Sequence, residues 1–217
     1  SLERLRSSKA QRMNVLAIDT SVGVSVAILR SNGELTQSPA VDHGMQGELT
    51  AELISQVVAE SGLEISDITD VVVGVGPGPF TGLRVGLVTA GVFAHARNIP
   101  IHGICSLDAI AFDYAKPCVV VTDARRKELY WARYEDKRIG EPQVSKPEDL
   151  LAQFPNTEFV GPGAHLYPDS INGKLLDLKA GSLAKLFVSG NAQLVDVSPM
   201  YLRKPDAVEP TTRKSVL

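Results

Sequence analysis

The sequence is poor in cysteine and contains no long apolar run. Its 217 residues include two cysteines, Cys105 and Cys118, which lie in apolar surroundings without the spacing of a metal site. We interpret them as buried free thiols in a reducing compartment rather than as a disulfide. No apolar run reaches the ~18 residues that a membrane-spanning helix needs. These absences predict a cytoplasmic protein without a membrane segment.

Basic residues are not in excess. The formal net charge is −3 at pH 7, whereas domains that bind nucleic acid directly usually carry a basic footprint. The basic turn at residues 125–127 could still touch a phosphate, or it could simply be solvated. Hydrophobic residues make up 44% of the chain and charged residues 22%, which is ordinary for a globular protein. The length suits one domain or two small lobes.

Several catalytic signatures are missing. The sequence contains no His-Glu-x-x-His, no Gly-x-Ser-x-Gly and no Cys-x-x-Cys motif, which argues against a protease. No Gly-Lys-Ser/Thr follows its glycine-rich segment, so that segment is not a Walker P-loop. The sequence therefore predicts no catalytic residue and no metal site.

The most informative segment that is present is a loop rich in glycine and proline at residues 74–86. It joins an apolar run to a helical pattern. Glycine allows close approach of the backbone, and proline keeps the loop in one shape. We interpret the segment as a rigid turn, although a phosphate contact at the following helix N-terminus stays open. Its distinctive residues are Gly76, Pro77, Gly78, Phe80, Thr81 and Arg84, with Thr81 as the expected helix cap.

The order of the patterns predicts an α/β protein with two lobes. A first lobe is expected over residues 13–105 and a smaller second lobe over residues 106–205, with residues 1–12 and the tail 206–217 outside the fold. Alternating or continuous apolar runs predict strands, and apolar residues three or four apart predict helices. The expected strands are 14–18, 22–28, 34–38, 71–75, 100–105, 119–123, 129–134 and 159–160; the expected helices are 46–62, 81–97, 107–114, 147–154 and 182–189, and residues 137–147 are read as a polar connection.

Four phrases of the sequence resemble a known family. They are residues 16–21 (Leu-Ala-Ile-Asp-Thr-Ser), residues 74–86, residues 122–131 (Thr-Asp-Ala-Arg-Arg-Lys-Glu-Leu-Tyr-Trp) and residues 201–203 (Tyr-Leu-Arg). In this order they are similar to the TsaB (YeaZ) family, and the match runs from Met13 to about Pro205. The phrase at residues 74–86, together with the one at residues 122–131, is the specific part.

The resemblance implies a fold and a function. The fold is the actin-like ATPase (ribonuclease H-like) fold, with a mixed sheet and helices in each lobe and a reduced second lobe. The function is that of a non-catalytic subunit that binds and activates a TsaD-type catalytic subunit, which makes N6-threonylcarbamoyladenosine at position 37 of tRNAs that read codons beginning with adenosine. Implied partners are this subunit, a TsaE-type ATPase and a second copy of the chain, with tRNA reached only through the complex.

The resemblance also implies a nucleotide site, which the sequence shows as degenerate. Members of this superfamily grip phosphates with two hairpins, and here Asp19, Thr20 and Ser21 match the first while Asp123 opens the second. Bulky residues 124–127 replace the glycines of the second hairpin. The paired metal histidines of TsaD-type proteins are absent, since Gly47 follows His43 at that spacing. We expect no cofactor in the isolated chain and ATP or ADP only within the complex; the alternative is an autonomous kinase or ATPase that uses Asp19 and Asp123.

Small residues recur every four positions on the helix expected after the glycine loop. A ridge without side chains allows two helices to approach closely, either within the chain or between chains. The resemblance favours an interface in which residues 46–62 and 81–97 form half of a helix bundle. The expected interface residues are Leu49, Leu53, Gly82, Gly86, Ala90 and Ala94.

Overall fold

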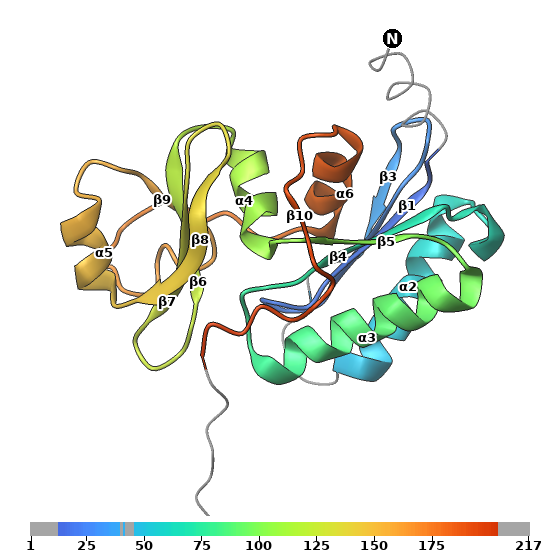
Figure 1. Ribbon diagram of the computed structural model, residues 1–217, viewed down its shortest axis with the longest axis horizontal. Coiled ribbons are helices and arrows are strands. Elements are labelled where there is room, and N and C mark those ends of the chain that lie inside the picture. Colours follow the sequence, from blue (N-terminus) through green and yellow to red (C-terminus); the bar gives the residue numbers. More distant parts are fainter. Residues whose placement is uncertain (1–12, 40, 42–45, 204–217) are drawn as a thin grey trace, which may run out of the picture.

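The computed structural model describes residues 13–39, 41 and 46–203 and contains two β-sheets separated by a helix (Figure 1). The first sheet has six strands in the order β10-β5-β4-β1-β2-β3, in which β1, β4 and β5 are parallel to one another and the other pairs are antiparallel. These strands are β1 (Val15–Asp19), β2 (Ser25–Leu29), β3 (Leu35–Gln37), β4 (Asp70–Gly74), β5 (Ile101–Ile104) and β10 (Leu194–Val195).

Alternate side chains of the first sheet belong to two apolar cores. Leu16 and Ile18 of β1 pack with helices α2 (Gln46–Ser61) and α3 (Phe80–Arg97). Val15 and Ala17, which point to the opposite face, pack with α6 (Ala180–Val188). Because successive residues of a strand face opposite sides, a strand buried on both faces is continuously apolar. A 3₁₀ turn, η1 (Ile65–Asp67), lies between α2 and β4.

The second sheet has four strands in the order β8-β7-β6-β9, of which only the β6–β9 pair is parallel among the described strands. One face packs against α4 through Leu107 and Ile110, and the other packs against α5 through Leu150. Helix α4 therefore lies between the two sheets (Figure 1). The elements are α4 (Ser106–Tyr114), β6 (Cys118–Asp123), β7 (Leu129–Tyr134), β8 (Arg138–Ser145), α5 (Pro147–Gln153) and β9 (Phe159–Val160).

The expected α/β class, with a mixed sheet in each lobe, is confirmed. Cys105 and Cys118 are buried and free, as predicted. No helix in the described part of the chain is long and apolar enough to span a bilayer. The expected segments 1–12 and 206–217 lie outside the described residues.

Three expectations need correction. The reading of residues 137–147 as a connection is wrong, because Arg138–Ser145 is a strand that pairs with β7, and its burial does not alternate residue by residue. The expected second lobe of residues 106–205 includes two elements that belong to the first lobe: α6 packs on the first sheet, and β10 is its edge strand. Thr81 does not cap α3: the N-cap is Pro79, with no side-chain cap hydrogen bond.

Candidate functional site

Asp19, Thr20 and Ser21 form a buried turn at the end of β1. The Asp19 carboxylate accepts hydrogen bonds from the Ser21 backbone N–H at 2.8 Å, the Ser21 hydroxyl at 2.6 Å and the Ser106 hydroxyl at 2.6 Å. Desolvation by burial raises the pKa of Asp19, while these hydrogen bonds lower it by less. Burial thus disfavours the charge that would hold a metal ion, and the carboxylate serves contacts inside the fold.

The glycine loop packs directly on this turn. A Cβ atom added at Gly74 would lie 1.7 Å from Asp19 Oδ2, and one at Gly78 would lie 2.9 Å from the Ser21 carbonyl oxygen. The Gly76 N–H donates to Ser106 Oγ at 3.0 Å, which links the loop to the same network. Gly74 and Gly78 are therefore required by contacts between two segments of the chain, as expected for a rigid turn.

The remaining residues of the loop point in two directions. Pro77 is buried, whereas Phe80, Thr81 and Arg84 are exposed at the start of α3. The Phe80 ring stacks on Tyr201 with 4.7 Å between ring centroids, and the Arg84 guanidinium lies over the Phe80 ring at 5.2 Å. The loop thus joins α3 to the chain segment that follows β10.

The six residues expected at a partner interface are all turned inward. A Cβ atom at Gly86 would lie 2.2 Å from Thr20 Oγ1, and the Thr20 hydroxyl donates to the Gly82 carbonyl oxygen at 2.6 Å. The small-residue ridge therefore provides close packing within the chain. The expectation that these positions form a partner interface needs correction. Gly82, Gly86, Ala90, Ala94 and Leu53 are buried, and Leu49 is half-buried against the same core.

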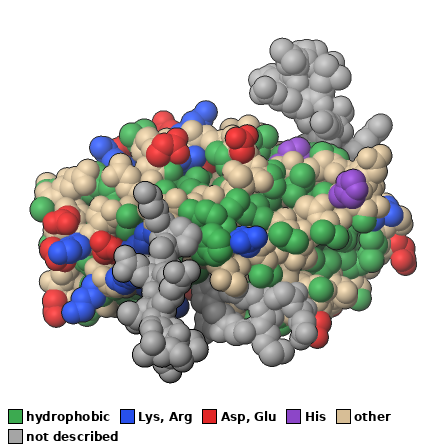
Figure 2. Space-filling model, turned by 60° about the horizontal axis from the view of Figure 1, so that its bottom comes forward, with side chains coloured by type: hydrophobic (Ala, Val, Ile, Leu, Met, Phe, Trp, Pro, Cys, Tyr) green, Lys and Arg blue, Asp and Glu red, His purple; other side chains and the backbone are tan. Residues whose placement is uncertain are grey.

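A different stripe of α3 faces solvent. Val88 and Val92 are 62% and 64% exposed, and Phe80 is 41% exposed. These residues and the exposed Arg84 are four positions apart, so they lie on one side of the helix. Figure 2 shows hydrophobic side chains gathered on the face of the molecule that carries α3. This set, Phe80, Arg84, Val88 and Val92, is called the α3 outer stripe below.

The hairpin that begins at Asp123 differs from a phosphate-binding turn. Arg125, Arg126 and Lys127 all have positive φ, at 62°, 53° and 60°. Residues other than glycine adopt this left-handed backbone conformation at a cost of about 1–2 kcal/mol each. The Asp123 carboxylate accepts a hydrogen bond from the Arg125 backbone N–H at 2.7 Å and pairs with the Arg125 guanidinium at 3.3 Å. Asp123 therefore stabilises its own turn.

The cavity next to Asp19 is too small for a nucleotide. Its volume is about 170 Å³, whereas ligand pockets usually measure about 300–1,000 Å³. Asp19, Val24, Pro162 and Leu178 line it, and Asp123 does not. This cavity thus does not fit ATP or ADP, because its volume is small and the Asp19 carboxylate is held by Ser21 and Ser106. Among the described residues no three His, Cys, Asp or Glu side chains group as metal ligands.

Sequence reasoning missed two features. The α3 outer stripe could have been found from the spacing of its valines, but the small-residue ridge has the same period. The buried cluster of Asp108, Tyr134 and Arg138 gave no local signal, since its members come from three elements.

Comparisons with known proteins agree on one family. A sequence model of the family described as TsaD: tRNA N6-adenosine threonylcarbamoyltransferase matches residues 46–193. An uncharacterized protein of Mycobacterium tuberculosis is 38% identical over 210 residues, which cover 92% of this chain and 96% of the relative. The tRNA threonylcarbamoyladenosine biosynthesis protein TsaB of Escherichia coli is 26% identical over 219 residues, which cover 88% of this chain and 95% of the relative.

A solved structure shows the same fold. The structure of YeaZ from Pseudomonas aeruginosa aligns with a TM-score of 0.73 at 22% identity and covers 88% of this chain and 100% of that one. This likeness shows that the chain shares the fold of that protein, with the mixed α/β architecture that the sequence predicted. The family-model match over residues 46–193 and the TsaB and YeaZ relatives together show that the chain belongs to the TsaB (YeaZ) family of tRNA threonylcarbamoyladenosine biosynthesis proteins.

Proposed function

We propose that this chain acts in the synthesis of N6-threonylcarbamoyladenosine in tRNA as a non-catalytic subunit. It binds and activates a TsaD-type catalytic subunit in the cytoplasm, and it meets tRNA only through the complex, which also includes a TsaE-type ATPase. The Escherichia coli relative, a tRNA threonylcarbamoyladenosine biosynthesis protein, supports the pathway. We infer the subunit role from the exposed α3 outer stripe and from the buried Asp19 turn.

The observation that carries the proposal is the α3 outer stripe. Two valines that are more than three-fifths exposed lie one turn apart on a helix, in line with an exposed phenylalanine. Contiguous exposed apolar surface of this kind is typical of a site of protein association. Exposed polar residues of the neighbouring helix α2, Glu52, Gln56 and Glu60, supply a polar rim, which is the usual anatomy of such an interface. The interface that we infer is therefore the outer surface of α2 and α3.

The buried turn at Asp19 supports a role without catalysis. A group that takes part in phosphoryl transfer must reach a substrate or a magnesium ion. The hydrogen bonds from Ser21 and Ser106 instead hold the carboxylate inside the fold, and burial raises its pKa. We therefore do not favour the autonomous kinase or ATPase.

The test uses the double variant Val88→Asp/Val92→Asp. Because both side chains face solvent, the free energy of unfolding of the variant should differ from that of the parent by no more than about 0.5 kcal/mol. Association with the catalytic subunit of the same organism should weaken by about thirtyfold or more, since loss of an interface anchor costs about 2 kcal/mol. Calorimetry measures the affinity, and reconstituted tRNA modification measures the activity.

The matched control is Leu166→Asp, which places the same charge on an exposed apolar residue of the second lobe. It should leave affinity and tRNA modification unchanged. Undiminished affinity of the folded double variant would remove the α3 outer stripe from the interface. Modification that proceeds without this chain would reject the subunit role, and steady ATP turnover by the isolated chain would favour the alternative enzyme.

A further inference from the structure

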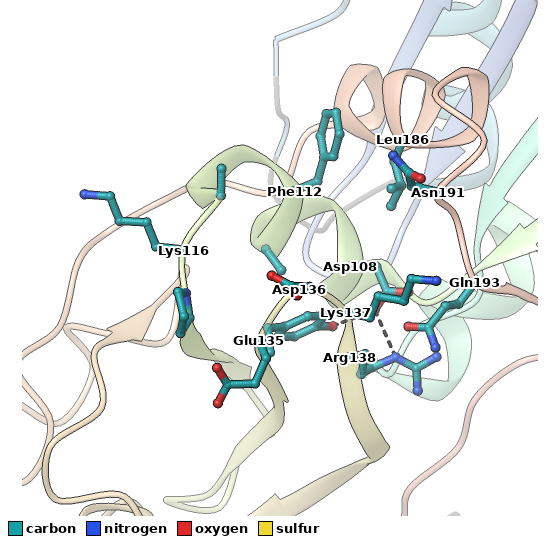
Figure 3. Close-up of a pocket in the computed structure, with 14 residues that line it drawn as sticks. Asp108, Phe112, Lys116, Glu135, Asp136, Lys137, Arg138, Leu186, Asn191 and Gln193 are labelled. Atoms are coloured by element: carbon teal, nitrogen blue, oxygen red, sulfur yellow. Dashed lines mark hydrogen bonds and ion pairs between the residues drawn. The ribbon is translucent and has the colours of Figure 1, made fainter.

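A second cavity lies beside α4, and the proposed function does not use it (Figure 3). Its volume is about 490 Å³, within the usual range for ligand pockets. Three segments enclose it: the C-terminal half of α4, the turn between β7 and β8, and the chain between α6 and β10. The cavity thus lies between α4, the β7–β8 turn of the second sheet and the segment that leads from α6 to β10 of the first sheet.

The floor of this cavity is a buried ionic cluster. Tyr134 donates a hydrogen bond to Asp108 Oδ1 at 2.6 Å, and Arg138 Nε donates to the same oxygen at 3.0 Å. Arg138 Nη1 donates to the Gly140 carbonyl oxygen at 3.3 Å and lies 3.5 Å from Glu141. These contacts hold a guanidinium whose side chain is only 4% exposed.

One nitrogen of this guanidinium is left over. Arg138 Nη2 makes no hydrogen bond with a residue in the described part of the chain, although Arg138 lines the cavity. Nη2 is not one of the buried polar atoms that lack a partner, so it reaches the open space of the cavity rather than the closed interior. The fixed orientation of Nη2 therefore provides a preorganised donor for an acceptor that enters the cavity.

A second cation shares this end of the cavity. Lys137 lines it and forms no ion pair with any residue of the described ranges. In Figure 3 the ends of Lys137, Arg138 and Gln193 point to the same side of the cavity. The lining carries three cations and three anions, but the charge of Glu135 is balanced by Arg133, which is outside the lining, at 2.6 Å. With Glu141, which lies 3.5 Å from Arg138 and is also outside the lining, the charges balance. Lys116, Lys137 and Asp136 are the lining charges that form no ion pair within the described residues.

The opposite wall is apolar. Ala111, Phe112 and Ala115 of α4 and its C-terminal turn face Leu186 of α6 across the opening. An apolar wall with a few polar groups at one end is the usual form of a small-molecule site. Such a wall can hold a short hydrocarbon body but makes no use of an inorganic ion.

We propose that this cavity binds a small organic carboxylate. The carboxylate oxygens accept hydrogen bonds from Arg138 Nη2 and Lys137 Nζ, and the hydrocarbon body lies against Phe112 and Leu186. The site is separate from the α3 outer stripe, so a failure of this proposal would not affect the proposed subunit role.

The test measures binding of 4-methylpentanoate to the full chain by calorimetry, with the backbone amide shifts of residues 134–138 as a second readout. The variant Lys137→Gln removes one cation at an exposed position and keeps the Asp108–Arg138 pair, so it should fold. We expect this variant to bind the carboxylate about tenfold more weakly, as for loss of a charge-assisted hydrogen bond. The matched control Lys146→Gln removes an exposed lysine that does not line the cavity and should leave the Kd unchanged.

Two further probes test the two halves of the proposal. The neutral amide 4-methylpentanamide should bind at least about tenfold more weakly than the acid, because it lacks the charge that meets Lys137 and Arg138. Inorganic phosphate should also bind more weakly, because it leaves the apolar wall uncovered. The proposal is overturned if the amide or phosphate binds as tightly as the acid, if Lys137→Gln and Lys146→Gln behave alike, or if millimolar acid produces neither heat nor shifts at residues 134–138.

Discussion

Replacing Gly86 with alanine tests the close packing of α3 on the Asp19 turn. The added Cβ would lie 2.2 Å from Thr20 Oγ1 and 3.0 Å from Thr20 Cγ2, so Thr20 must move and its hydrogen bond to Gly82 is lost. Overpacking costs about 1–3 kcal/mol and the hydrogen bond about 1 kcal/mol, while alanine improves the helix by about 1 kcal/mol. The net loss of unfolding free energy is therefore about 1–3 kcal/mol, and Tm falls by about 2–12 °C for a chain of this size.

Gly91 supplies the matched control on the same helix. A Cβ there meets nothing within 4 Å, so Gly91→Ala should gain up to about 1 kcal/mol from helix propensity alone. Urea and thermal unfolding followed by circular dichroism measure both variants beside the parent protein. Adding Thr20→Ala to Gly86→Ala should recover part of the loss, because the nearest atoms are then gone. A Gly86→Ala protein as stable as Gly91→Ala would refute the inward orientation of the ridge.

Two further predictions concern the two lobes. Burial raises the pKa of Asp19, so the contribution of its protonated form to stability is complete below the ordinary carboxyl pKa of 3.8 and is lost as the pH rises through the pKa of the folded state. The unfolding free energy of the parent should therefore fall, relative to that of Asp19→Asn, from about pH 4 upward. Urea titrations in which the two proteins keep a constant difference across pH would contradict this. Leu150→Ala should cost about 2–5 kcal/mol, because Leu150 is fully buried beside Trp131 in the core of the second sheet. The fluorescence of Trp131, the only tryptophan of the chain, reports this loss, and a change below about 1 kcal/mol would show that the site collapses without a cavity.

Local patterns were sufficient for most of the first lobe. The continuous apolar run before the glycine loop became β4, buried along its whole length, and the turn at Gly33 joins β2 to β3 as the hairpin signal predicted. Both patterns depend on neighbours in the chain, which is why sequence reasoning found them. The polar strand Arg138–Ser145 escaped it, because six of its eight residues are exposed or half-buried in a way that leaves no alternation to detect.

The prediction of the partner interface shows a limit of a different kind. A helix of small residues indicates that something lies close by, but the period of four does not say what. The structure identifies it as Thr20, at the end of β1 and far away in the sequence. The residues left for an external partner are then those on the opposite side, Val88 and Val92; their spacing of four equals that of the ridge, so the pattern alone does not say which set is exposed.

The sequence by itself determined most strands and helices of this protein, the family to which it belongs and the requirement for glycine at positions 74 and 78, since these depend on short-range periodicity, turn chemistry and motif order. Only the tertiary structure decided that the Asp19 carboxylate is sealed by Ser21 and Ser106, that α6 and β10 return to the first sheet, and which side of α3 is open. The physical reason is that burial and hydrogen bonding are set by contacts between segments distant in the chain. Asp19 and Ser106, for example, are 87 positions apart and yet share a hydrogen bond of 2.6 Å.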